Sequence, residues 1–170
     1  SIFGFLNSGE PYGFQEFLSR ADGSGAGLFD TEWLWSYLRS NLEPSILASP
    51  DGHRWSTAVD AVERCEARGA EPAQLRIVKT VALVDMLKER SGLVPSLEII
   101  EAANPDLDTV TISRSIETLK SWSILIDRRH LGSVSIYAGS DFDLDDALAK
   151  ARAESGDLDL SHLRSIGVLA

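Results

Sequence analysis

Four neighbouring segments decide the fold: AQLRIVKTVALVDMLKER over residues 73–90, PSLEIIEAAN over 95–104, DTVTISRSIETLKS over 108–121 and ILIDRRHLGSVSIY over 124–137. In the first segment, apolar residues go almost all the way round a helix, which is typical of a buried helix. The next two have the apolar spacing of a short helix and of an amphipathic helix. The last holds two β-branched runs, which are joined by a basic turn that contains glycine. Three helices followed by a two-stranded ribbon predict a winged helix over residues 71–140.

The residues before this region predict a small helical bundle over 1–70. Apolar residues recur at helical spacing over 12–20, in a helix that starts near Asp30 or Thr31 and ends before Pro44, and between Arg54 and Arg68. The fold class is therefore mainly α, with the bundle continuous with the winged helix through one central buried helix.

The last part of the chain, residues 141–170, has helical spacing of its apolar residues, so we expect a C-terminal helix or helices that pack on the winged helix. The chain starts with Ser1 rather than methionine, and its only methionine is Met86. We therefore expect it to be a piece of a longer protein.

Composition narrows the class of protein. The chain has 170 residues, a formal net charge of −10 and one cysteine, Cys65, which excludes an internal disulfide and a cysteine-rich zinc site. No apolar run is long enough for a membrane span, and no leader pattern opens the chain. We expect a cytoplasmic protein without a membrane or a metal as partner. The acidic balance argues against tight non-specific binding of nucleic acid.

Segments that resemble catalytic or ligand sites have simpler explanations. The glycine-rich run 22–27 lacks the Gly-Lys-Ser/Thr ending of a P-loop and is typical of a linker. The acidic run 141–146 lacks the glycine and glutamate of a calcium loop and is typical of a helix start. The three histidines lie far apart, and Cys65 lies on a predicted core stripe. The sequence therefore predicts no catalytic, cofactor-binding or metal-binding residue in this chain.

The candidate contact surface combines the third helix of the winged helix with the turn between its strands. On such a helix, polar side chains share the face opposite the apolar one, and the turn adds basic groups. The candidate residues for contact with nucleic acid or a protein partner are Arg114, Thr118, Lys120, Ser121, Arg128, Arg129 and His130. Because a duplex-binding protein makes roughly six to ten phosphate contacts, the few fixed cations of this surface, with Glu117 among them, favour a protein partner. The alternative is a purely structural role, in which Arg128 and Arg129 pair with carboxylates of the same protein or of its partner.

Four aromatic residues near the N-terminus are candidates for a second interface: Phe3, Phe5, Trp33 and Trp35. Aromatic side chains dominate interface energetics when they lie at a surface. Packing in the core is the commoner fate of such residues.

A family resemblance rests on four stretches of the chain. They are Ser1-Ile2-Phe3-Gly4-Phe5-Leu6 running into Glu10-Pro11, Arg54-Trp55 with Ala58 and Ala61, Arg76-Ile77-Val78-Lys79-Thr80-Val81-Ala82-Leu83, and Tyr137-Ala138-Gly139-Ser140-Asp141-Phe142-Asp143-Leu144. With them the chain resembles the helical and winged-helix region that follows the nucleotide-binding core of large bacterial P-loop ATPases of the STAND and AAA-like type. The resemblance implies an ATPase module upstream and a winged helix that senses nucleotide state or relays it to an effector. Some members look like prokaryotic defence or stress-response proteins. The shared motifs are structural, so no catalytic residue is carried over.

These observations lead to one functional expectation and two alternatives. We expect a non-catalytic regulatory part of a larger ATPase, whose winged helix couples nucleotide state to a protein partner, while the N-terminal aromatics meet the ATPase core or another subunit. The first alternative is a winged-helix transcriptional regulator that binds DNA and dimerises through its bundle. The second is an enzyme with scattered catalytic residues, for which a deep polar cleft would be the sign.

Overall fold

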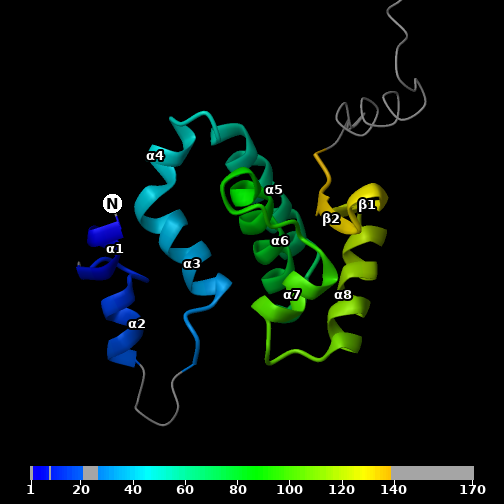
Figure 1. Ribbon diagram of the computed structural model, residues 1–170, viewed down its shortest axis with the longest axis horizontal. Coiled ribbons are helices and arrows are strands. Elements are labelled where there is room, and N and C mark those ends of the chain that lie inside the picture. Colours follow the sequence, from blue (N-terminus) through cyan, green and yellow to red (C-terminus); the bar gives the residue numbers. More distant parts are fainter. Residues whose placement is uncertain (1, 8, 21–26, 139–170) are drawn as a thin grey trace, which may run out of the picture. The chain divides into compact units, whose positions relative to one another are not determined.

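The computed structural model describes residues 2–7, 9–20 and 27–138, so the expectations for 22–26 and 141–170 lie outside the described residues. The described part is mainly helical with one two-stranded antiparallel sheet, as the sequence predicts. Ser1–Ala138 forms one compact unit. In chain order (Figure 1), the elements are α1 (Ile2–Asn7), α2 (Phe14–Arg20), α3 (Thr31–Tyr37), the π-helical segment η1 (Leu38–Leu42), α4 (Glu43–Leu47), α5 (Gly52–Ala67), α6 (Pro72–Ser91), α7 (Leu97–Ala103), α8 (Thr109–Ser121), β1 (Leu125–Arg128), the 3₁₀ turn η2 (Arg129–Leu131) and β2 (Ser133–Ile136).

Side-chain caps fix the starts of several helices. The Asp30 carboxylate accepts a hydrogen bond from the amide of Trp33 at 2.9 Å, so α3 starts where the sequence predicts. The Asp108 carboxylate accepts one from the amide of Thr111 at 2.8 Å at the start of α8. Each cap gives a partner to an amide that the helix itself leaves unpaired.

The helix that starts at Thr31 does not end before Pro44, which corrects the sequence-based prediction. It continues through η1 into α4, with Pro44 in the first turn of α4. Proline is tolerated there, because the amide that it lacks would have no partner within the helix in any case.

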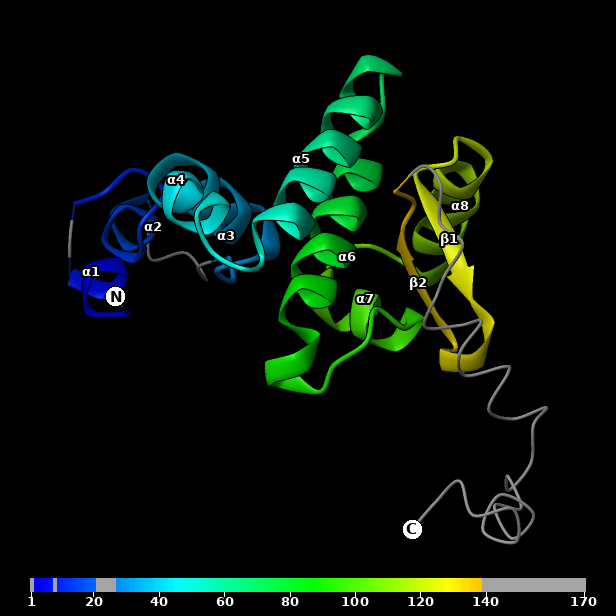
Figure 2. The same ribbon diagram turned by 90° about the horizontal axis from the view of Figure 1, so that it is seen from above.

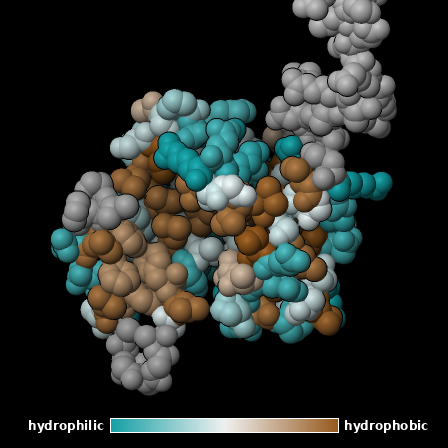
Figure 3. Space-filling view, viewed as in Figure 1, coloured by the Kyte–Doolittle hydropathy of each residue, from teal (hydrophilic) through white to brown (hydrophobic). Residues whose placement is uncertain are grey.

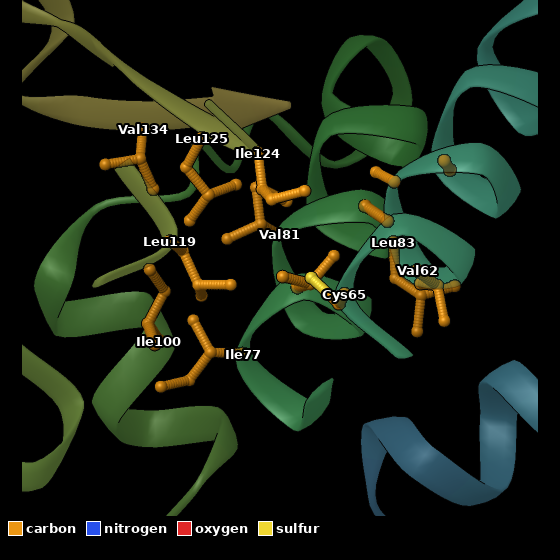
Figure 4. Close-up of a cluster of buried hydrophobic side chains, with 14 of the residues drawn as sticks. Val62, Cys65, Ile77, Val81, Leu83, Ile100, Leu119, Ile124, Leu125 and Val134 are labelled. Carbon is orange, nitrogen blue, oxygen red and sulfur yellow. The ribbon is translucent and has the colours of Figure 1, made fainter. Parts of the chain in front are cut away.

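The central helix α6 is buried over seven consecutive residues, 77–83, as its nearly continuous apolar pattern predicts. It packs against α3 and α5 on one side and against α7, α8 and β2 on the other. Figure 4 shows Val62 and Cys65 of α5, with Ile77 and Val81 of α6, in the same core as the hairpin residue Val134. The core of the bundle and that of the hairpin region are therefore continuous through α6.

Residues 124–137 form a β-hairpin, as predicted. β1 and β2 pair antiparallel, with Leu125 opposite Ile136 and Arg128 opposite Ser133. η2 makes the turn between them, and Gly132 follows it with φ of 58°, a left-handed conformation that glycine adopts without strain. Figure 2 shows the hairpin beside α8. The hairpin therefore places its basic turn next to the last helix.

Candidate functional site

The exposed face of α8 carries one arginine and two hydroxyl groups of the candidate set. Arg114 is exposed, and its guanidinium makes no hydrogen bond or ion pair with the described residues. The Thr118 hydroxyl donates to the Arg114 carbonyl at 3.0 Å, and the Ser121 hydroxyl donates to the Thr118 carbonyl at 2.7 Å. Both hydroxyl groups are thus used within the helix, so Arg114 is the group of this face with the most freedom to contact a partner.

Lys120 is held between two carboxylates. Its ammonium lies 2.7 Å from the Asp127 carboxylate on β1 and 2.9 Å from the Glu117 carboxylate on α8. Hydrogen bonds to Asp127 and then to Glu117 raise the pKa of Lys120, although burial opposes the shift. The interaction joins α8 to the hairpin and reduces the charge that Lys120 offers to a phosphate.

The two arginines of the hairpin differ in their surroundings. Arg128 is half-buried and donates from Nε to the Ser135 hydroxyl at 2.9 Å across the strands. Arg129 is exposed at the turn and makes no ion pair with the residues that the structure describes. His130 lies in η2, and its side chain is outside the described part. Arg129 is therefore the cation of the hairpin that a partner reaches most directly.

A cavity of about 290 Å³, which the sequence analysis did not predict, lies between α7, α8 and the hairpin. Its walls are mainly apolar and its edge is charged; it is lined by Pro95, Leu97, Ile100, Ser113, Ile116, Glu117, Asp127, Arg128, Arg129, Gly132, Ser133 and Val134. Leu97, the first residue of α7, borders the cavity and is 41% exposed. Only the fold shows that this apolar side chain borders a cavity.

The aromatic candidates have different places in the structure. Trp35 is 3% exposed and stacks on Trp55 with ring centroids 4.8 Å apart, so it is a core residue and not part of a surface. Phe5 and Trp33 are half-buried in a cluster with other rings, where Phe29 packs edge-on against Phe5. Nothing is described of the Phe3 side chain. The cluster leaves Phe5 and Trp33 as the partly accessible aromatics of the candidate set.

A second apolar depression of about 600 Å³ lies between α3, η1 and α4 on one side and the end of α6 on the other. It is lined mainly by Leu34, Leu38, Leu42, Ile46, Met86 and Leu87. Figure 3 shows apolar surface in this region of the molecule. Its charged neighbours Arg54 and Glu89 pair with each other at 2.6 Å, so the depression has no uncompensated charge from this pair.

Cys65 is fully buried in the core, where the sequence places it. Burial raises the pKa of its thiol to about 11, and the neighbouring Arg64 and Arg68 oppose this shift only in part. Since the thiolate is the reactive form, Cys65 is a structural thiol and not a nucleophile at neutral pH.

Within residues 2–7, 9–20 and 27–138, no three His, Cys, Asp or Glu side chains are grouped so as to hold a metal ion. No helix of this part is both long enough and apolar enough to cross a bilayer. Comparison of the chain with models of protein families, with curated proteins and with solved structures finds no match.

Proposed function

We propose that this chain is the non-catalytic interaction region of a larger bacterial P-loop ATPase. In this proposal α6, α7, α8 and the hairpin act as a winged helix that relays the nucleotide state of the ATPase core to a protein partner. The bundle formed by the preceding helices faces the ATPase core, with Phe5 and Trp33 among its partly accessible contacts.

The observation that supports the proposal best is the pair of hydrogen bonds made by Arg64 of α5. Its guanidinium donates to the Ser123 carbonyl at 3.1 Å and to the Tyr137 carbonyl at 3.0 Å. Ser123 precedes β1 and Tyr137 follows β2, so both carbonyls lie at the open end of the hairpin, opposite its turn. A displacement of α5 therefore acts on both strands at the open end of the hairpin, which is what a relay between bundle and hairpin needs.

The charges of the hairpin region favour a protein partner over DNA. Lys120 is bound by Asp127 and Glu117, so three cations at most face a duplex while two carboxylates stand among them. Strong duplex binding takes roughly six to ten phosphate contacts. The unpaired Arg114 and Arg129 are the observation that favours the second candidate function, a DNA-binding regulator.

The relay is tested by amide hydrogen exchange on the complete natural protein, with and without a non-hydrolysable ATP analogue. We expect nucleotide to change the exchange of β1 and β2, and Arg64→Met to abolish this effect. Arg54→Met is the matched control, because Arg54 lies on the same helix but pairs with Glu89 of α6 and not with the hairpin. The relay is contradicted if the ATP analogue leaves amide exchange of the hairpin unchanged, or if the Arg64→Met variant still shows the nucleotide-dependent change.

Two further observations separate the candidates. A Gly-x-x-x-x-Gly-Lys-Ser/Thr motif between a strand and a helix, upstream in the natural protein, is required by the ATPase assignment. A fluorescence titration with random duplex at low and moderate salt tests the DNA alternative: a salt-sensitive affinity that is lost in Arg128→Ala plus Arg129→Ala supports the regulator. Weak binding that is unchanged in this variant supports the relay.

A further inference from the structure

We propose that the cavity between α7, α8 and the hairpin binds one large apolar side chain of a protein partner, in a segment that carries carboxylates beside that side chain. This inference rests on the proposed function, because it specifies the kind of partner that the hairpin contacts.

The size of the cavity fits one large side chain. Its volume of about 290 Å³ lies at the lower end of the volumes of ligand pockets, which are about 300–1,000 Å³. Ile100, Ile116 and Val134, all buried, form its base, and the exposed Leu97 borders it. An apolar side chain placed here removes apolar surface of both molecules from water, which is favourable.

The charges at the edge of the cavity determine what must stand beside that side chain. The carboxylates of Glu117 and Asp127 are both engaged by Lys120. Arg129 lines the cavity, is exposed and makes no ion pair with the described residues. The charge left for a ligand is thus a guanidinium, whose planar array of donors matches a carboxylate in a two-point interaction.

A buried hydroxyl group at the same place also lacks a partner. Ser133 lines the cavity and is 7% exposed, and its Oγ makes no hydrogen bond with the described residues. Buried polar groups in folded proteins are nearly always hydrogen-bonded. Ser133 is therefore a polar group beside the cavity that the described residues leave without a hydrogen bond.

A duplex fits this place less well than an acidic peptide segment does. DNA has no apolar side chain to fill the cavity, so a duplex gains nothing from its apolar walls. Duplex binding therefore becomes one of the outcomes that the experiment separates.

The test measures binding of a fluorescein-labelled short peptide, with one central phenylalanine flanked by aspartates, by fluorescence anisotropy on the full chain. Two control probes replace the phenylalanine by alanine or the aspartates by asparagine. We expect the first probe to bind at least about tenfold more tightly than either control, because the anchor and its charge partner carry most of the affinity.

Two variants of the protein address the cavity and its charge separately. Ser113→Trp fills the cavity from α8, and Arg129→Glu reverses the charge at the exposed turn. We expect each to weaken binding of the phenylalanine probe by about tenfold or more. Arg90→Glu is the matched control for charge, because Arg90 is an exposed residue of α6 that does not line this cavity. Circular dichroism confirms that each variant is folded, and Arg129→Glu, at an exposed turn, tests the proposal even if Ser113→Trp does not fold.

The outcomes are distinct for the inference and for the proposed function. Equal binding of the three probes, or unchanged binding in Arg129→Glu, overturns the inference, and so does binding of a random duplex that both Arg114→Glu and Arg129→Glu abolish. If instead the hairpin of the complete protein responds to nucleotide but the phenylalanine probe does not bind, the relay holds and the cavity is not its contact. If the probe binds as expected but nucleotide does not change amide exchange of the hairpin, the cavity is a peptide site outside the proposed relay.

Discussion

Lys79 illustrates how single polar residues fix the bundle to the central helix. It is 8% exposed in the middle of α6, and its ammonium pairs with the Glu32 carboxylate of α3. Next to this pair, the hydroxyl groups of Thr31 and Thr80 lie 2.8 Å apart and share a hydrogen bond. A buried ammonium that loses its partner still carries the free-energy cost of its removal from water. The loss of Glu32 and the loss of Lys79 are therefore expected to lower stability by different amounts.

This inequality gives the first prediction. Glu32→Ala is expected to lower the free energy of unfolding by roughly 1–3 kcal/mol, since it leaves the Lys79 charge buried without a partner. Lys79→Met is expected to cost clearly less, because methionine keeps the apolar stem and needs no counter-charge. Urea denaturation of both variants measures the difference; a Lys79→Met variant that is less stable than Glu32→Ala contradicts it.

Two neighbouring tryptophans give the second prediction, because Trp35 is in the core and Trp33 is only half-buried. Trp35→Ala is expected to destabilise the chain by about 3–5 kcal/mol, the cost of emptying a large buried site. Trp33→Ala serves as the comparison and is expected to cost less than half as much. Thermal unfolding followed by circular dichroism ranks the two, and the reverse order would assign Trp35 to a surface.

At the scale of the element, the start of α8 depends on Asp108. Its carboxylate accepts hydrogen bonds from the amide and from the hydroxyl of Thr111, both at 2.8 Å. These bonds favour the charged form and lower the pKa of Asp108 below its ordinary value, the bond from the Thr111 amide being the larger cause. The cap is therefore strongest when Asp108 is ionised.

The third prediction follows from the sign of this shift. A carboxylate whose pKa is lower in the folded state contributes stability above its ordinary pKa of about 4, and this contribution is lost as the pH falls through the folded value. In Asp108→Asn, which keeps an effective cap, we expect stability near pH 7 to change little and the loss between about pH 5 and pH 2 to be smaller than in the unaltered chain. Denaturant unfolding at a series of pH values measures how the free energy of unfolding of each chain depends on pH. If this dependence is the same in both chains, the pKa of Asp108 does not differ between the folded and the unfolded state.

At the scale of the whole molecule, α6 makes one core of two regions that the sequence divides at residue 70. Its buried residues face α3 and α5 as well as α8 and β2, and Arg64 connects α5 to the open end of the hairpin. Neither region can expose its side of α6 without a large loss of apolar burial.

We therefore predict that the bundle and the hairpin region unfold in one cooperative transition. Intrinsic fluorescence reports mainly on the bundle, which holds Trp33, Trp35 and Trp55, and amide exchange of α8 and the hairpin reports on the other region. The two measurements should give the same midpoint in urea, as a two-state unit requires. Midpoints that differ beyond experimental error would show two separate domains.

Much of the fold could be predicted from sequence because its signals are local. The apolar pattern of α6, the caps at Asp30 and Asp108, and the β-branched runs on either side of a glycine-containing turn involve residues within a few positions of one another. The continuation of the helix past Pro44 was not predicted. Proline is tolerated only in the first turn of a helix, and the sequence pattern did not show that a new turn starts at Glu43.

The sequence by itself thus determined the order of the helices, the hairpin and the buried character of α6, since periodicity and capping act between near neighbours. Only the tertiary structure decided the places of Trp35 and Lys120, the hydrogen bonds of Arg64 to carbonyls 59 and 73 residues away, and the apolar cavity with Arg129 at its edge. The physical reason is that these interactions join residues that chain connectivity leaves far apart. Their partners are set by packing around α6, and no local pattern encodes that choice.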